Sequence, residues 1–349
     1  MKKVFVLSIF LILFISCKSI QIAKVNFFTR VQIDTILIDK ISIRSITVSS
    51  DKVWYAADKN RVGLLSLAGA NKMESKINKD SLKLEFRSMA QTSNSIFILN
   101  VGNPALLYKF SKELTLKKIV YEEHDEKIFY DSMQFWNDTE GIAVGDPIED
   151  CLSIIITRDG GETWTKISCN NLPKVVDGEA AFAASNTNIV CKGNATWIVS
   201  GGKKSRVYYS PDKGITWSVY ETPIVQGKSM TGIFTADFYN EKIGFIAGGN
   251  YDMPNQNFEN KAITTNGGKN WKLVGENQGF GYASCIQFVP NSNGRKLVCV
   301  GTSGLFYSKN KGKSWKQFSS DSSLYTLRFI NDSTAVVAGK DKVIKVIFK

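Results

Sequence analysis

Four short segments of the chain follow one pattern, Ser/Thr-x-Asp/Asn-x-Gly-x-polar-Trp. They read Thr157-Arg-Asp-Gly-Gly-Glu-Thr-Trp164, Ser210-Pro-Asp-Lys-Gly-Ile-Thr-Trp217, Thr264-Thr-Asn-Gly-Gly-Lys-Asn-Trp271 and Ser308-Lys-Asn-Lys-Gly-Lys-Ser-Trp315. The third residue of each, Asp159, Asp212, Asn266 or Asn310, can accept hydrogen bonds from backbone N–H groups of its own turn, and the glycine permits positive φ. We expect Trp164, Trp217, Trp271 and Trp315 to begin the next strand and to pack on neighbouring structure. The pattern therefore predicts a repeated turn between two strands.

A second repeat, an apolar strand that ends in a small residue and a polar turn, occurs seven times. Its copies are 54–58, 97–103, 142–146, 198–202, 245–249, 298–302 and 336–340. The copies lie roughly 40 to 55 residues apart, which is the period of propeller blades. The two repeats together predict an all-β, seven-bladed β-propeller of four-stranded antiparallel blades. The last unit lacks one strand, so we expect the N-terminal run 27–33 to complete it and close the ring.

The N-terminus has the layout of a secretory signal. Met1-Lys2-Lys3 precedes a mainly apolar run, 4–15, that is too short to cross a bilayer. Ser16-Cys17 resembles a bacterial lipobox, in which the signal is removed and the new N-terminal cysteine is acylated; the alternative is an ordinary signal peptide with an incidental cysteine. The lipobox reading predicts a signal peptide at 1–16, a lipidated tether at 17–25 and one propeller domain at 26–349. It also predicts an exported lipoprotein, anchored through Cys17 to a membrane, with the outer membrane expected, and facing the periplasm.

Five further cysteines show no C-x-x-C spacing, which argues against a thioredoxin-like motif or a zinc ribbon. Cys151 and Cys169 are equally distant from the predicted turn at Gly160, so they can face each other across two strands and form a disulfide. Two unpaired thiols are the alternative. His124 is the only histidine, and neither Gly279-Phe-Gly281 nor 201–205 completes a nucleotide-binding motif. We therefore expect no metal and no cofactor.

The chain is basic, with a formal net charge of +12. Most of the charge comes from scattered lysines, and the densest places are 203–206 and the series Lys309, Lys311, Lys313 and Lys316. Scattered lysine indicates solvation, with weak attraction to anionic headgroups or acidic polymers. Nucleic acid is not an expected partner outside the cytoplasm.

The four quoted segments resemble the Asp-box (BNR) repeat, which sialidases and many non-enzymatic propellers share. Asn266 and Asn310 replace the aspartate in two copies. From about Arg44 onward the chain also resembles the propeller family of the photosystem II stability and assembly factor and its bacterial relatives. The segments that carry the resemblance are 43–46, 53–56, 135–146, 178–188, 232–238 and 244–251. That resemblance implies a non-catalytic scaffold that binds a protein or an assembly intermediate. Some bacterial relatives carry an oxidoreductase label.

An enzyme with a site in the propeller funnel is the alternative function. A sialidase-like glycosidase needs a cluster of arginines and a tyrosine nucleophile, and the chain lacks the Phe/Tyr-Arg-Ile-Pro segment of sialidases. A two-carboxylate glycosidase could use Asp131, Asp146 and Glu179 if the three converge. The alternative for these acids is turn capping, or ion pairing with Arg44 or Arg206.

The small-residue turns and the Asp-box turns end successive strands, so they emerge on opposite faces of the ring. We expect the binding surface on the face of the small-residue turns, because its loops mix acidic, basic and aromatic side chains. The residues predicted there are Arg44, Asp131, Asp146, Glu179, Arg206, Asn250, Tyr251 and Tyr282. The sequence thus predicts an exported, lipid-anchored scaffold that binds a protein partner near the membrane.

Overall fold

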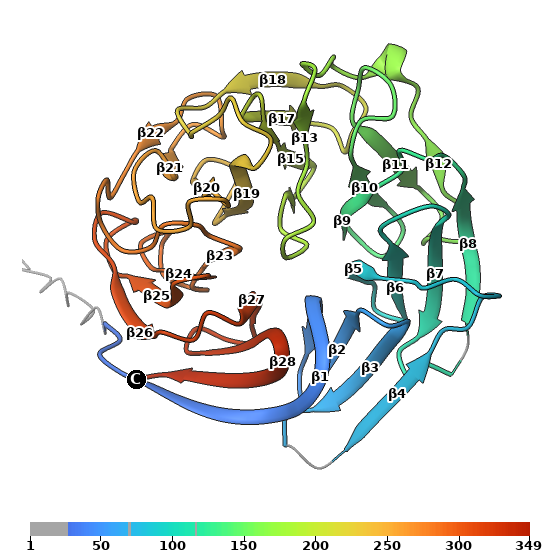
Figure 1. Ribbon diagram of the computed structural model, residues 1–349, viewed down its shortest axis with the longest axis horizontal. Coiled ribbons are helices and arrows are strands. Elements are labelled where there is room, and N and C mark those ends of the chain that lie inside the picture. The colour runs from blue at the N-terminus through green and yellow to red at the C-terminus, as the bar shows by residue number, and fades with distance from the viewer. Residues whose placement is uncertain (1–26, 69–70, 116) are drawn as a thin grey trace, which may run out of the picture.

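The computed structural model describes residues 27–349 apart from 69, 70 and 116. The described strands form a closed ring of antiparallel sheets around a central axis (Figure 1). The predicted signal peptide and Cys17 lie outside the described residues. Within the described part, no helix is long and apolar enough to cross a membrane.

Four of the sheets have four strands each. The first contains β5 (Phe86–Gln91), β6 (Ser95–Asn100), β7 (Ala105–Ser111) and β8 (Lys117–Glu123). The second contains β9 (Tyr130–Phe135), β10 (Gly141–Gly145), β11 (Ser153–Thr157) and β12 (Thr165–Lys166). The third contains β14 (Ile189–Lys192), β15 (Ala195–Val199), β17 (Arg206–Ser210) and β18 (Ser218–Glu221), and the fourth contains β23 (Cys285–Phe288), β24 (Leu297–Gly301), β25 (Gly304–Ser308) and β26 (Lys316–Ser319). A short 3-10 helix, η1 (Cys169–Asn171), follows β12.

Two sheets have six strands. The first contains β1 (Val31–Ser49), β2 (Lys52–Ala57), β3 (Arg61–Ser66), β4 (Lys72–Lys76), β27 (Leu324–Phe329) and β28 (Thr334–Phe348), in the order β27-β28-β1-β2-β3-β4. The second contains β13 (Glu179–Ala180), β16 (Gly201–Gly202), β19 (Thr231–Phe238), β20 (Gly244–Asn250), β21 (Lys261–Thr264) and β22 (Lys272–Leu273), in that order.

The predicted number of blades, seven, is wrong: the described strands form six sheets. The reason lies in β1 and β28, which pass from one partner strand to the next without a break. β28 pairs with β27 through 335–339 and with β1 through 340–348. β1 in turn pairs with β28 through 31–42 and with β2 through 43–49. The first and last predicted blades therefore share one sheet.

The same pairing confirms that the N-terminal run closes the ring. Val31 lies opposite Phe348, and the ladder continues to Ser42 opposite Lys340. An ionic cluster reinforces this region: the guanidinium of Arg61 binds the carboxylates of Asp39 and Glu74. β1 and β28 thus join the two ends of the chain with no exposed edge between them.

The small residue that recurs in the second repeat has a steric cause. A Cβ at Gly145 would lie 2.3 Å from the carbonyl oxygen of Phe129, and one at Gly301 would lie 2.4 Å from that of Tyr282. Both glycines end the second strand of their sheet, where neighbouring backbones crowd toward the axis. Larger side chains would push these strands apart.

The Asp-box turns have the predicted hydrogen bonds. Asp159 Oδ1 accepts from the N–H groups of Glu162 and Thr163, both at 3.0 Å. Thr157 Oγ1 accepts from Gly161 N–H at 2.9 Å, and Trp164 packs edge-on against Phe97 and Phe135. In the other three boxes the indole N–H donates to a glycine carbonyl of the same turn, at 2.9–3.1 Å. The two asparagines accept the same backbone bond as the aspartates, for example from Ser314 N–H to Asn310 Oδ1 at 3.0 Å.

We predict that Trp164→Ala lowers the free energy of unfolding by about 3 to 5 kcal/mol, because Trp164 is buried between two sheets. Asp159→Ala should cost only about 1 kcal/mol, since it removes a cap from an exposed turn. Denaturant unfolding of both variants checks the order. Equal losses would contradict this account of the box.

Candidate functional site

The segment between β13 and β14 fills the axis of the ring. It reaches toward the centre in Figure 1 (yellow-green), and residues 183–188 are all buried. The Asn186 side chain donates to Met89 O on β5 at 2.7 Å and accepts from Met133 N on β9 at 2.9 Å. We call residues 183–188 the axial plug.

The plug also binds the remaining sheets. Ser185 Oγ donates to Ser284 O, beside β23, at 2.6 Å, and Thr187 Oγ1 shares a hydrogen bond of 2.7 Å with Thr235 Oγ1 on β19. Arg44 on β1 donates to Ala184 O at 3.2 Å, and Arg328 on β27 donates to the plug carbonyls of Ser185 and Asn186 at 3.3 and 3.1 Å. Since β14 continues from the plug, the plug connects all six sheets.

Two of the predicted acids lie beside this segment. Asp131 on β9 is fully buried, and burial, followed by the negative charge of Asp146, raises the pKa of its carboxyl well above the usual range. Asp146, half-buried after β10, accepts from Ala181 N–H at 2.8 Å. Burial raises the pKa of Asp146 to about 7. The structure therefore brings Asp131 and Asp146 into one electrostatic pair.

Glu179 is held separately by an ion pair. Its carboxylate binds the guanidinium of Arg206 and accepts from Tyr208 O–H at 2.8 Å and from Ser200 O–H at 2.5 Å. The Glu179 side chain has no exposed surface. Pairing with Arg206 was the structural alternative for this acid, and the geometry agrees with it.

An aromatic row runs from the plug to the surface. The rings of Phe182 and Phe234 stack with centroids 4.0 Å apart, Phe234 meets Tyr282 edge-on at 4.8 Å, and Tyr282 meets Tyr251 edge-on at 5.1 Å. Tyr282 is buried whereas Tyr251 is 44% exposed. Of the predicted face residues, Tyr251 and Tyr282 are thus brought together.

The loop that carries Tyr251, between β20 and β21, also exposes Met253 and Phe258. Asn250 shapes the start of this loop, because its Oδ1 accepts from the N–H groups of Asp252 and Met253 at 3.0 and 3.2 Å. Asn250 is therefore a turn residue rather than a contact residue. We call Tyr251, Met253 and Phe258 the apolar loop.

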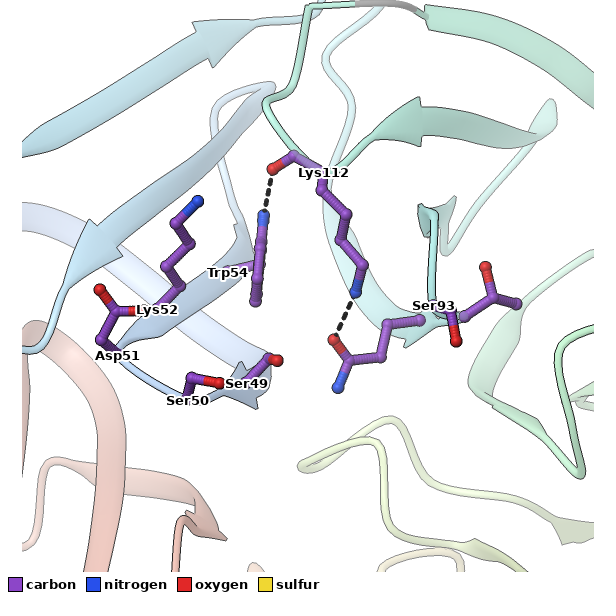
Figure 2. Close-up of a pocket in the computed structure, with 9 residues that line it drawn as sticks. Ser49, Ser50, Asp51, Lys52, Trp54, Ser93 and Lys112 are labelled. Carbon is purple, nitrogen blue, oxygen red and sulfur yellow. Dashed lines mark hydrogen bonds between the residues drawn. The ribbon is translucent and has the colours of Figure 1, made fainter.

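Two of the cavities in the described part of the chain lie at opposite ends of the ring. One, of about 700 Å³, lies beside Asp146 and is lined by Lys127, Glu149, Val176 and neighbours. The other, of about 480 Å³, lies between the β1–β2 and β5–β6 turns (Figure 2). There the Trp54 indole donates to Lys112 O at 2.8 Å, and the Lys112 ammonium donates to Gln91 Oε1 at 2.8 Å. The first of these two hydrogen bonds joins the β1–β4 strands to the β5–β8 sheet across the cavity.

Cys151 and Cys169 form a disulfide, with Cα atoms 5.5 Å apart. The bridge joins the chain before β11 to η1 after β12. Among the described residues, Glu149, Asp150 and Cys169 lie close enough to suggest metal ligands, but the Cys169 sulfur is bonded to Cys151. This group therefore offers two exposed carboxylates and no thiolate.

The family model for the BNR/Asp-box repeat matches residues 155–166, which span the first quoted turn. The chain is a β-propeller with Asp-box repeats. No curated protein sequence matches it significantly. Solved structures with the same fold include YCF48 bound to D1 peptide, at 11% identity, covering 93% of this chain and 98% of that chain with a TM-score of 0.63.

Two further solved structures show the same architecture. YCF48 from Cyanidioschyzon merolae is 12% identical, with 90% of this chain and 98% of that chain covered and a TM-score of 0.63. The WD40 β-propeller domain of Doa1 is 11% identical, with 93% and 98% covered and a TM-score of 0.64. At such low identity these similarities establish the propeller fold.

Sequence reasoning missed the plug as a structural element, and it missed Phe182, Phe234, Met253 and Phe258. The plug had a signal, because the run Ala183-Ala-Ser-Asn-Thr-Asn188 is too small and polar for an ordinary strand. The aromatic row had no signal in the sequence, because its four rings come from four separate segments.

We predict that the contribution of Asp146 to the free energy of unfolding falls by about 2 kcal/mol between pH 4 and 7, after allowance for solvent near its partly exposed side chain. A pKa raised from 3.8 to about 7 means that the folded protein keeps a proton that the unfolded chain loses. The stabilisation is therefore complete below pH 4 and is lost as pH rises through 7. Denaturant unfolding across this range measures it.

Subtracting the free energy of unfolding of Asp131→Asn/Asp146→Asn from that of the unaltered protein cancels the other titrating groups, such as the half-buried Asp237, and the difference should fall between pH 4 and 7. The same subtraction with Asp252→Asn, at an exposed carboxyl, should give no such fall. A difference that does not change with pH for the double variant would show that the buried pair does not contribute this pH dependence.

Proposed function

We propose that this propeller is a non-catalytic scaffold that binds a protein segment through the apolar loop and the aromatic row behind it. The observation that carries the proposal is the exposure of Tyr251, Met253 and Phe258 on one loop, at 44%, 56% and 46%. Aromatic and methionine side chains are enriched at the centres of protein interfaces. Tyr282 supports Tyr251 from beneath, so part of this surface is already ordered before binding.

The comparisons support a peptide or protein as the partner class. One propeller of the same fold was solved bound to D1 peptide. The present chain offers a comparable ring of loops, although its own partner must be recognised by its own residues. An extended segment with apolar side chains suits the apolar loop.

The geometry favours the scaffold over an enzyme with a funnel site. The plug occupies the axis where such a site would lie, with Ser185, Asn186 and Thr187 all buried. Glu179 already holds Arg206, Tyr208 and Ser200, so it does not join Asp131 and Asp146 as a third carboxylate. The acids therefore serve the packing of the plug in this proposal.

Affinity capture after crosslinking in native membranes tests the scaffold. The variant Tyr251→Ser/Met253→Ser/Phe258→Ser should lose the partner that the unaltered protein captures. The control Ile38→Ser/Met73→Ser/Ile215→Ser changes three exposed apolar residues elsewhere, at 79%, 47% and 69%, and should keep it. Equal recovery with both variants, or no defined partner with the unaltered protein, would overturn the proposal.

We further propose that the protein is exported and anchored through Cys17 on the periplasmic side of a membrane. Support comes from the signal-like N-terminus and from the Cys151–Cys169 disulfide, because disulfides persist in oxidising compartments.

Membrane fractionation tests the anchor. Cys17→Ser should move the protein from the membrane fraction to a soluble or uncleaved form and should abolish metabolic labelling with palmitate. Cys191→Ser serves as the control. Labelling that persists without Cys17 would contradict the anchor.

A further inference from the structure

The sheet β23–β26 is basic and has no acidic residue. From Asn277 to Ser320 the chain contains six basic residues and no Asp or Glu. The basic residues are Arg295, Lys296, Lys309, Lys311, Lys313 and Lys316, and we call them the basic patch. Arg295, Lys309, Lys313 and Lys316 are exposed.

The fold gathers these residues at one end of the sheet. Arg295 lies in the β23–β24 turn, and Lys309, Lys311 and Lys313 lie in the Asp-box turn between β25 and β26. The two turns touch, since Lys311 N–H donates to Arg295 O at 2.8 Å. Asp332, in the β27–β28 turn, is the acid that acts on Lys296 at the margin of the patch.

Asn310 keeps this turn folded without adding a negative charge. Its Oδ1 accepts from Ser314 N–H and from Ser308 O–H, both at 3.0 Å. In the β17–β18 box, Asp212 accepts the equivalent bonds at 2.8 and 2.9 Å with a carboxylate. The asparagine therefore preserves the turn and leaves the patch purely cationic.

The N-terminal segment leaves the ring at this same patch. Phe27, the first described residue, is 40% exposed, and the Lys309 ammonium lies 4.9 Å from its ring centroid. The Lys296 ammonium lies 4.6 Å from the Phe28 ring, and Lys316 Nζ donates to Thr29 O at 2.7 Å. Nine residues lie between Cys17 and Phe27, so a chain anchored at Cys17 would hold the patch within about 35 Å of a bilayer.

From this juxtaposition we infer that the basic patch, with Phe27 beside it, is a surface that docks on an anionic lipid bilayer. Lysine and arginine near a membrane are attracted by anionic headgroups, and a single lipid anchor combined with a basic patch binds far more firmly than either alone. Docking in this way presents the Asp-box end of β23–β26 to the membrane. The apolar loop lies at the opposite end of its strands and remains open to a partner.

Vesicle binding tests the surface without the acyl chains. The probe is the chain begun at Lys18, which retains the whole closed ring, added to vesicles of phosphatidylcholine with or without phosphatidylglycerol. We expect binding to the anionic vesicles, weak binding to the neutral ones, and loss of binding as salt is raised.

The variant Arg295→Glu/Lys309→Glu/Lys313→Glu should bind anionic vesicles roughly a hundredfold more weakly, which corresponds to about 1 kcal/mol for each basic residue lost. The control Lys127→Glu/Lys203→Glu/Lys228→Glu makes the same change in net charge on exposed lysines of the other end. It should bind like the unaltered protein. Thermal melting verifies that both variants are folded.

Equal weakening by the two variants would overturn the proposal, because net charge alone would then explain binding. Failure of the unaltered protein to prefer anionic vesicles would overturn it too, even if the protein bound a soluble polyanion such as dextran sulfate. Partner capture by the apolar loop is a separate measurement, so either proposal can fail without the other.

Discussion

The hydrogen bonds of the axial plug are the constraint on which the rest of the structure depends. The Asn186 side chain binds both β5 and β9, and Ser185 and Thr187 extend the connection to β23 and β19. A buried polar side chain is costly unless its bonds are satisfied, so these bonds require each innermost strand to keep its place. The centre of the ring is therefore a polar core, and we expect the functional surfaces at the two ends and the rim of the ring.

The two ends of the ring differ in chemistry. One carries the apolar loop, with Tyr251 supported by Tyr282, and the paired acids Asp131 and Asp146. The other carries the Asp-box turns, of which the β25–β26 turn is cationic. A scaffold held at a membrane needs both a surface toward the bilayer and a surface away from it. The proposals for the two ends are therefore compatible, although different residues carry them.

The fold could be predicted from the sequence because its determinants are local. The hydrogen bonds of each Asp-box turn form between residues that are close in the sequence. The recurrent glycine is required where neighbouring backbones crowd together at one strand end. The number of sheets could not be predicted, because whether β1 and β28 bend without a break depends on pairing between the two ends of the chain. The Cys151–Cys169 pair was predictable as one of two alternatives from its symmetry about a turn.

The candidate site was only partly predictable, for the same reason. Tyr251, Tyr282, Asp131 and Asp146 were placed on one face by topology, and the structure brings them together in pairs. Strand topology does not determine how side chains pair. Arg206 and Glu179 were therefore predicted as binding-face residues, and the ion pair that they form was predicted only as the alternative. The plug required contacts between segments as far apart as Asn186 and Arg328, which no local pattern encodes.

Hydrogen–deuterium exchange of the free protein tests the central claim, that the axis is a filled core rather than an open funnel, most directly. Peptides that cover 183–188 should exchange as slowly as those that cover β19 and β23, and far more slowly than those from the loop 251–259. Exchange of 183–188 as fast as that of the loop would show that the plug does not hold the sheets together. A functional site in the funnel would then again be a valid hypothesis.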